Sequence, residues 1–129
     1  MNTNQNPAVL IVEDEYMNAW ALALILKPHF VVRHAATAEE ARYWLNREVF
    51  SFIMMDIRLG TEPRAGFELL REARDIQPDV VIFATTGMGM GRDADSFLEA
   101  GFNAYYPKPI LEAQVLADML RICGRDRAA

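Results

Sequence analysis

The chain has 129 residues, of which 52% are hydrophobic and 24% charged, and its formal net charge at pH 7 is −5. This length and composition predict one globular domain that buries its own core, rather than a disordered chain. The negative net charge gives no basis for direct nucleic-acid binding. No apolar stretch approaches the roughly 20 residues that span a bilayer, so we expect no membrane segment. We expect a cytoplasmic protein with one domain over 1–129, a core of about 8–123 and short flexible tails.

Short continuous apolar runs alternate with longer amphipathic stretches along the chain. The runs predict five strands, at 8–12, 30–32, 52–55, 80–84 and 103–106. The stretches between them predict five helices, at 15–27, from 37 onward, at 67–76, 92–100 and 110–123. Pro28 ends the first helix, and Thr37 with Glu40 forms the capping-box pattern that begins the second.

Two expectations concern side-chain burial in the helices. The apolar face of the first helix is expected to consist of Ala19, Trp20, Ala23, Leu24 and Leu26. The single cysteine, Cys123, cannot form an internal disulfide, which fits a reducing compartment, and we expect it to be buried in the last helix.

Five strand–helix units in strict alternation predict an α/β fold with a parallel sheet covered by helices on both faces. Right-handed crossovers leave few topologies, and the flavodoxin-like, doubly wound order 2-1-3-4-5 is the commonest for five strands. Strands one and three are neighbours in that order, which brings Glu13, Asp14 and Asp56 together at their carboxyl ends. Because three converging acids repel one another, the pattern indicates a bound hard cation.

The polar residues at the strand ends form an ordered set. An acidic pair, Glu13-Asp14, follows the first strand, Asp56 the third, a threonine the fourth and Lys108-Pro109 the fifth. With this set the chain resembles a response-regulator receiver domain of two-component signalling over roughly residues 8–123. The resemblance implies a single-domain response regulator that is no enzyme and accepts a phosphoryl group on Asp56 from a histidine kinase or phosphotransfer protein.

The resemblance also implies a role for each site residue. Asp14 and Asp56 would hold Mg²⁺ or Mn²⁺, with Glu13 acting through a bound water and the backbone carbonyl of Arg58 supplying another oxygen. The metal would keep Asp56 an anionic nucleophile and neutralise charge on the incoming phosphoryl group. Lys108 would place its ammonium against a phosphoryl oxygen. The structural alternative for the acidic pair is a solvated turn at the positive end of a helix dipole.

Two pairs of neighbouring residues compete for one role each. Strand side chains alternate, so only one of Thr85 and Thr86 can face the phosphoryl group. The spacing to Lys108 and the Thr-Gly step favour Thr86, whereas the Phe-Ala-Thr segment favours Thr85. Tyr105, three residues before Lys108, matches the switch aromatic of receivers, and its neighbour Tyr106 is expected to point the other way.

Two loops depart from the commoner receiver pattern. The loop after Asp56 has Gly60 in place of the usual proline and is about two residues longer before Gly66. Three glycines in the segment 87–91 predict a mobile loop, whose methionines either cover the next helix or form an adaptable binding surface.

The resemblance predicts that output passes to a downstream protein through the surface of the fourth helix, fifth strand and fifth helix. Self-association through the fourth and fifth helices is left open. A pseudo-receiver that is never phosphorylated is the first alternative function. A metal-dependent phosphatase with an aspartate nucleophile is the second, and it needs an acid at the position that Arg58 occupies.

Overall fold

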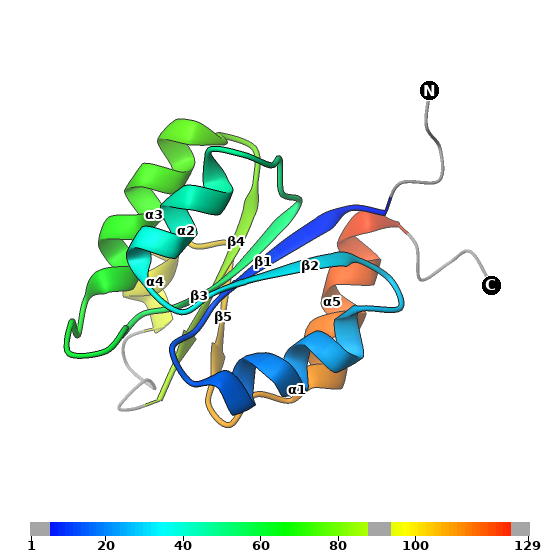
Figure 1. The fold of residues 1–129 in the computed structure, drawn as a ribbon. Coiled ribbons are helices and arrows are strands. Elements are labelled where there is room, and N and C mark those ends of the chain that lie inside the picture. The colour runs from blue at the N-terminus through cyan, green and yellow to red at the C-terminus, as the bar shows by residue number, and fades with distance from the viewer. Residues whose placement is uncertain (1–5, 88–93, 125–129) are drawn as a thin grey trace.

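A five-stranded parallel sheet forms the centre of the computed structural model, which describes residues 6–87 and 94–124 (Figure 1). The strands are β1 (Ala8–Val12), β2 (Val31–Ala35), β3 (Phe52–Asp56), β4 (Val81–Thr86) and β5 (Ala104–Pro107). Their order in the sheet is β2-β1-β3-β4-β5, and every neighbouring pair is parallel. The predicted flavodoxin-like topology is therefore confirmed.

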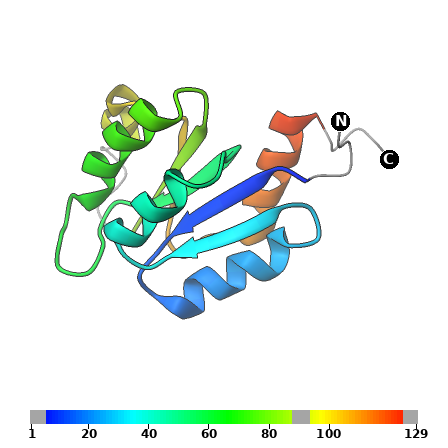
Figure 2. The ribbon, with the colours of Figure 1, turned by 45° about the horizontal axis from the view of Figure 1, so that its top comes forward.

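The described residues form five helices, which make one layer on each face of this sheet. They are α1 (Tyr16–Leu26), α2 (Ala38–Leu45), α3 (Ala65–Ile76), α4 (Ala94–Ala100) and α5 (Glu112–Cys123). Figures 1 and 2 show α1 and α5 on one face of the sheet and α2, α3 and α4 on the other. In the described residues no helix has the length and apolar character that crossing a bilayer requires.

The two layers divide the core between alternate residues of each strand. In β3, Ile53 and Met55 pack under α2, α3 and α4, whereas Phe52 and Met54 pack under α1 and α5. Every residue of β3 is buried. A strand covered on both faces has no polar side, which explains why its sequence is a continuous apolar run rather than an alternating one.

Most predicted elements begin and end within two residues of the observed ones. Asp56 is the last residue of β3 rather than the residue after it, and α3 begins at Ala65 instead of 67. The Thr37 cap is confirmed, since its side chain accepts a hydrogen bond from the backbone N–H of Glu40 at 3.1 Å. Residues 92–93 of the predicted fourth helix and 88–91 of the predicted mobile loop lie outside the described residues.

Two burial predictions are wrong. The buried residues of α1 are Ala19, Leu22 and Leu26, while Trp20 and Leu24 are exposed. Apolar residues surround this helix on all sides, so the sequence alone does not say which side meets the sheet. Cys123 is exposed as well, because it is the last residue of α5 and lies at the end of the packed helix.

Candidate functional site

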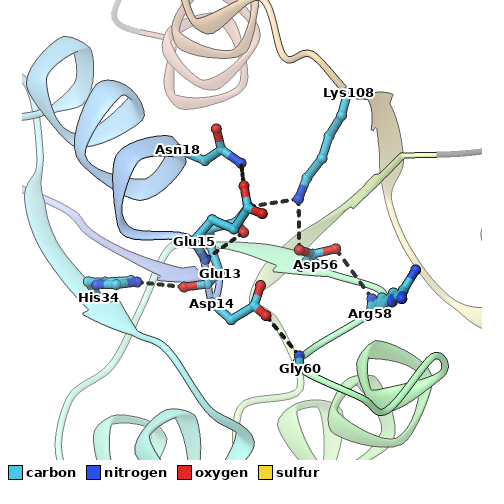
Figure 3. A network of polar contacts seen from close by, with 9 residues as sticks. All are labelled: Glu13, Asp14, Glu15, Asn18, His34, Asp56, Arg58, Gly60 and Lys108. Carbon is cyan, nitrogen blue, oxygen red and sulfur yellow. Dashed lines mark hydrogen bonds and ion pairs between the residues drawn. The ribbon is translucent and has the colours of Figure 1, made fainter.

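Three carboxylates meet where β1 and β3 end (Figure 3). These strands pair in parallel with Val12 opposite Met55, so the residues that follow in each chain lie side by side. Oxygens from Glu13, Asp14 and Asp56 all lie within 4.8 Å of one another. This all-oxygen donor set suits a hard divalent cation such as Mg²⁺, and the structure brings together the acids predicted to hold it.

Lys108 joins two of these acids from the end of β5. Its Nζ lies 2.8 Å from Oδ2 of Asp56 and 2.9 Å from Oε1 of Glu13. Its backbone N–H donates to the carbonyl of Thr86 at 2.7 Å, which ties the start of this segment to β4. The side chain thus reaches across the sheet edge, and a single ammonium contacts two buried carboxylates (Figure 3).

Backbone N–H groups hold one oxygen of each carboxylate in place. Glu13 Oε2 accepts from Glu15 at 3.0 Å, and Asp14 Oδ2 accepts from Gly60 at 2.9 Å. Asp56 Oδ1 accepts from the N–H of Arg58 at 3.3 Å. The loop after β3 therefore contacts both ends of the acidic cluster.

Gly60 lies in a tight turn whose flanking residues, Leu59 and Glu62, exchange two backbone hydrogen bonds of 3.1 and 2.9 Å. Its φ of 57° lies in the left-handed region that glycine adopts without strain. The turn aims the Gly60 N–H at Asp14, so the departure from the usual proline here has a structural use in this chain.

Burial dominates the electrostatics of the cluster. It raises the pKa of both Glu13 and Asp56, and the hydrogen bonds from Lys108 offset this only in part. Burial also lowers the pKa of Lys108, but its two carboxylate partners outweigh that effect and raise the pKa. Three carboxylates facing one ammonium leave excess negative charge, which a divalent cation would neutralise.

An open cavity of about 1070 Å³ gives solvent access to this cluster. Asp14, Asp56, Arg58, Thr86 and Lys108 are among the residues that line it. Both candidate threonines are buried, but Thr85 is not part of the cavity wall, whereas Thr86 is. The placement favours Thr86 as the hydroxyl that faces a group bound to Asp56.

The two adjacent tyrosines of β5 point into opposite helical layers, as expected from strand alternation. The Tyr105 ring packs at 5.8 Å from the ring of Phe97 on α4. Tyr106 points the other way, where its hydroxyl donates to Oδ2 of Asp118 on α5 at 2.5 Å. Burial and the Asp118 carboxylate both raise the pKa of Tyr106 well above its usual value, so this hydroxyl stays a donor across the physiological range.

Replacing Tyr106 by phenylalanine is expected to lower the free energy of unfolding by about 1–2 kcal/mol at pH 7, because a donor to a charged acceptor is lost. Burial raises the pKa of Asp118, but its hydrogen-bond donors outweigh burial and lower it. That stabilisation is lost as pH falls through the lowered pKa, so the two proteins should converge in acid. Urea unfolding at several pH values measures the difference. Tyr43→Phe on the exposed side of α2 is the matched control, and an equal loss there would contradict the assignment.

Two residues of this region were not singled out from the sequence. His34 Nε2 lies 2.7 Å from the backbone carbonyl of Glu13, which anchors the segment that carries the acidic pair (Figure 3). The parallel register sets His34 opposite Ile11. A polar residue near the end of β2 is therefore the sequence feature that could have identified His34. Gly66, which the sequence marks only as the end of a loop, packs directly against the backbone of Asp56.

Most of the chain is similar to known signalling proteins. The family model of the response regulator receiver domain matches residues 9–121. The hydrogenase transcriptional regulatory protein HoxA of Cupriavidus necator is 32% identical over 108 residues, which cover 83% of this chain and 22% of that protein. The autoinducer 2 sensor kinase/phosphatase LuxQ of Vibrio vulnificus is 31% identical over 118 residues, 90% of this chain and 14% of that protein. The chain thus spans less than a quarter of the length of these relatives.

Solved structures agree with the family match. The receiver domain protein of Methanospirillum hungatei has a TM-score of 0.81 and 26% identity, covering 97% of this chain and 100% of that one. A response regulator protein of Burkholderia pseudomallei, solved with a phosphorylated aspartic acid, calcium ion and citrate, has a TM-score of 0.78 and 26% identity, covering 95% of this chain and 74% of that one. With its sheet order and its acidic cluster at the strand ends, the chain belongs to the response regulator receiver domain family.

Proposed function

We propose that this receiver accepts a phosphoryl group on Asp56 and passes the signal to a downstream protein. The observation that carries the proposal is the Asp56 carboxylate itself, which lines an open cavity, contacts the Lys108 ammonium and has two further acids within 4.8 Å. This is the environment that lets a carboxylate serve as a nucleophile toward phosphorus. The solved relative from Burkholderia pseudomallei, with its phosphorylated aspartic acid and calcium ion, supports the same chemistry here.

In the proposed reaction an oxygen of Asp56 forms a bond to phosphorus while the bond from phosphorus to the donor breaks, giving an acyl phosphate. Asp14, Asp56 and the Arg58 carbonyl would hold Mg²⁺ or Mn²⁺, with Glu13 acting through a water. When bound, the metal supplies positive charge that screens the attacking and incoming anions from each other. Lys108, now paired with Asp56, is placed to contact a phosphoryl oxygen instead.

The phosphoryl donor in this proposal is a histidine kinase or a phosphotransfer protein. The similarity to LuxQ supports a kinase-linked role, since that relative is named as a sensor kinase/phosphatase. The reaction is proposed for the cytoplasm, where a single cysteine that forms no disulfide would stay reduced.

The proposed switch begins at Thr86, whose hydroxyl would move toward the phosphoryl group. Tyr105 would follow by changing its packing against Phe97, which alters the surface of α4, β5 and α5. That surface is the proposed contact for the downstream partner. The two residues that initiate and relay the change lie on adjacent strands, with Ala84 opposite Tyr105 in the register.

The test is phosphorylation by acetyl phosphate with Mg²⁺, read by intact mass. Wild type and Asp75→Asn, a matched change on the exposed side of α3, should each gain one phosphoryl group, whereas Asp56→Asn should gain none. Chelation of the metal should suppress the gain in wild type and in Asp75→Asn. No gain in wild type, or an equal gain in Asp56→Asn, would refute the proposal and favour a receiver that is never phosphorylated.

A further inference from the structure

Most large side chains exposed on α1 are apolar, and Asn18 is the exposed polar residue of this helix. The five large side chains exposed there are Tyr16, Met17, Trp20, Leu24 and Ile25, with exposed fractions of 68%, 74%, 59%, 48% and 38%. We call this set the α1 face. The helix contains no charged residue at all, and its opposite side is already buried against the sheet and α5.

The spacing of these residues makes the α1 face one continuous surface. Tyr16, Trp20 and Leu24 follow one another at intervals of four, and Met17 and Ile25 lie beside that row. Rows of this kind are the ridges through which helices pack on one another. A contiguous exposed apolar patch of this size marks an interaction site, whereas single exposed residues such as Leu98 on α4 need no explanation.

The ends of α1 carry opposite charges. Glu15, exposed, precedes the helix, and Lys27, also exposed, ends it. In an antiparallel pair of two α1 helices, the Glu15 end of each copy lies beside the Lys27 end of the other, and the helix dipoles also oppose each other favourably. The uncharged middle lets two copies approach without like-charge contacts, although each chain carries a net charge of −5.

Size and charge favour a second copy of the chain over a lipid surface as the partner of the α1 face. Helices that lie on anionic membranes carry Lys and Arg beside their apolar face, whereas α1 is preceded by the acids Asp14 and Glu15. The α1 face exposes on the order of 600 Å² per copy, so a pair that covers it fully buries roughly 1,200 Å², the lower limit of specific protein interfaces. A patch that is complementary to itself satisfies both copies at once in a two-fold pair.

We propose that two copies of this chain associate through their α1 faces, with the helices antiparallel and Trp20 near the two-fold axis. The interface is distinct from the α4–β5–α5 surface, so a pair joined in this way leaves that surface accessible. Association at this size is reversible and depends on protein concentration.

Sedimentation velocity of the 129-residue chain, from micromolar to sub-millimolar concentration, tests the proposal. Wild type should shift from monomer to dimer with concentration. Trp20→Glu should weaken dimerisation by at least about a hundredfold, because it places an unpaired charge at the centre of the interface. Leu98→Glu, the matched change on α4, should leave it unaltered. Leu24→Asn, near the edge of the α1 face, is the second variant if Trp20→Glu does not fold.

A charge exchange tests the antiparallel orientation. Lys27→Glu should weaken the dimer by about twofold to fivefold, and Glu15→Lys in the same chain should restore it. Wild type that stays monomeric throughout, or dimers lost in Leu98→Glu and kept in Trp20→Glu, would overturn the proposal. Binding of monomeric wild type to anionic phospholipid vesicles, abolished by Trp20→Glu, would overturn it in favour of a membrane partner.

Discussion

Replacing Gly66 by alanine is expected to lower the free energy of unfolding by about 3 kcal/mol, the upper end of the range for overpacking, because the new methyl group meets rigid backbone. A Cβ at this position would lie 2.7 Å from both the carbonyl oxygen of Asp56 and the Cα of Ile57. Gly66 is buried, and its N–H donates to the carbonyl of Ile57 at 2.8 Å, so the helix cannot move away without losing that bond.

The change should also slow phosphorylation, because the backbone that must shift carries Asp56 and leads to Arg58. Thermal unfolding and acetyl phosphate labelling measure the two effects on one protein. Gly87→Ala is the matched control, since a Cβ there has no atom within 4 Å, and its unfolding should match that of wild type within about 0.5 kcal/mol. Equal behaviour of the two variants would show that α3 accommodates the methyl group without strain.

Removing the Lys108 ammonium is expected to have the second largest effect. Lys108→Ala leaves Glu13 and Asp56 buried without their cation, and breaking a buried pair in this way costs about 3–5 kcal/mol. Because the cavity admits water to this cluster, we expect a smaller loss of about 2 kcal/mol in the free energy of unfolding, in metal-free buffer at pH 7. Arg71→Ala, which removes an exposed cation from α3, should change stability little.

The pH dependence of this loss follows from the raised pKa values. Burial is the largest effect and raises the pKa of Glu13 and Asp56 in the folded chain, while the hydrogen bonds from Lys108 lower it by less. Such groups destabilise the folded state when ionised, and the penalty disappears as pH falls through their folded pKa values. Wild type and Lys108→Ala should therefore converge in acid, and a difference that is constant with pH would contradict this account.

Mg²⁺ should narrow the difference in stability between wild type and Lys108→Ala at neutral pH. A ligand present at about 100 times its dissociation constant stabilises the folded chain by about 2.7 kcal/mol, and the variant offers carboxylates that no ammonium occupies. Mg²⁺ should therefore raise the unfolding midpoint of Lys108→Ala more than that of wild type. A midpoint that does not respond to Mg²⁺ in either protein would argue against a metal at the acidic cluster.

The fold was predictable because the strands are covered on both faces. A strand such as β3 reads as a short apolar run, and five such runs separated by amphipathic stretches leave one common topology. The meeting of Glu13, Asp14 and Asp56 then follows from the sheet order, because β1 and β3 are neighbours.

Side-chain direction was harder to predict. An amphipathic helix shows its buried side in its sequence, but α1 is apolar on every side, so Trp20 was wrongly placed inward. The choice between Thr85 and Thr86 depended on where the pleat of β4 begins, which no turn signal in the sequence fixes. The close approach of Gly66 to Asp56 joins a helix to a strand end, and such tertiary contacts leave no local pattern.

The edge strand β5 contacts two helices, and this bears on the proposed signal output. Its consecutive tyrosines are fixed to different helices, Tyr105 by ring packing against Phe97 of α4 and Tyr106 by a hydrogen bond to Asp118 of α5. Lys108 follows directly at the end of the same strand. In the proposed switch a displacement of β5 would move both contacts, so the positions of α4 and α5 would change together.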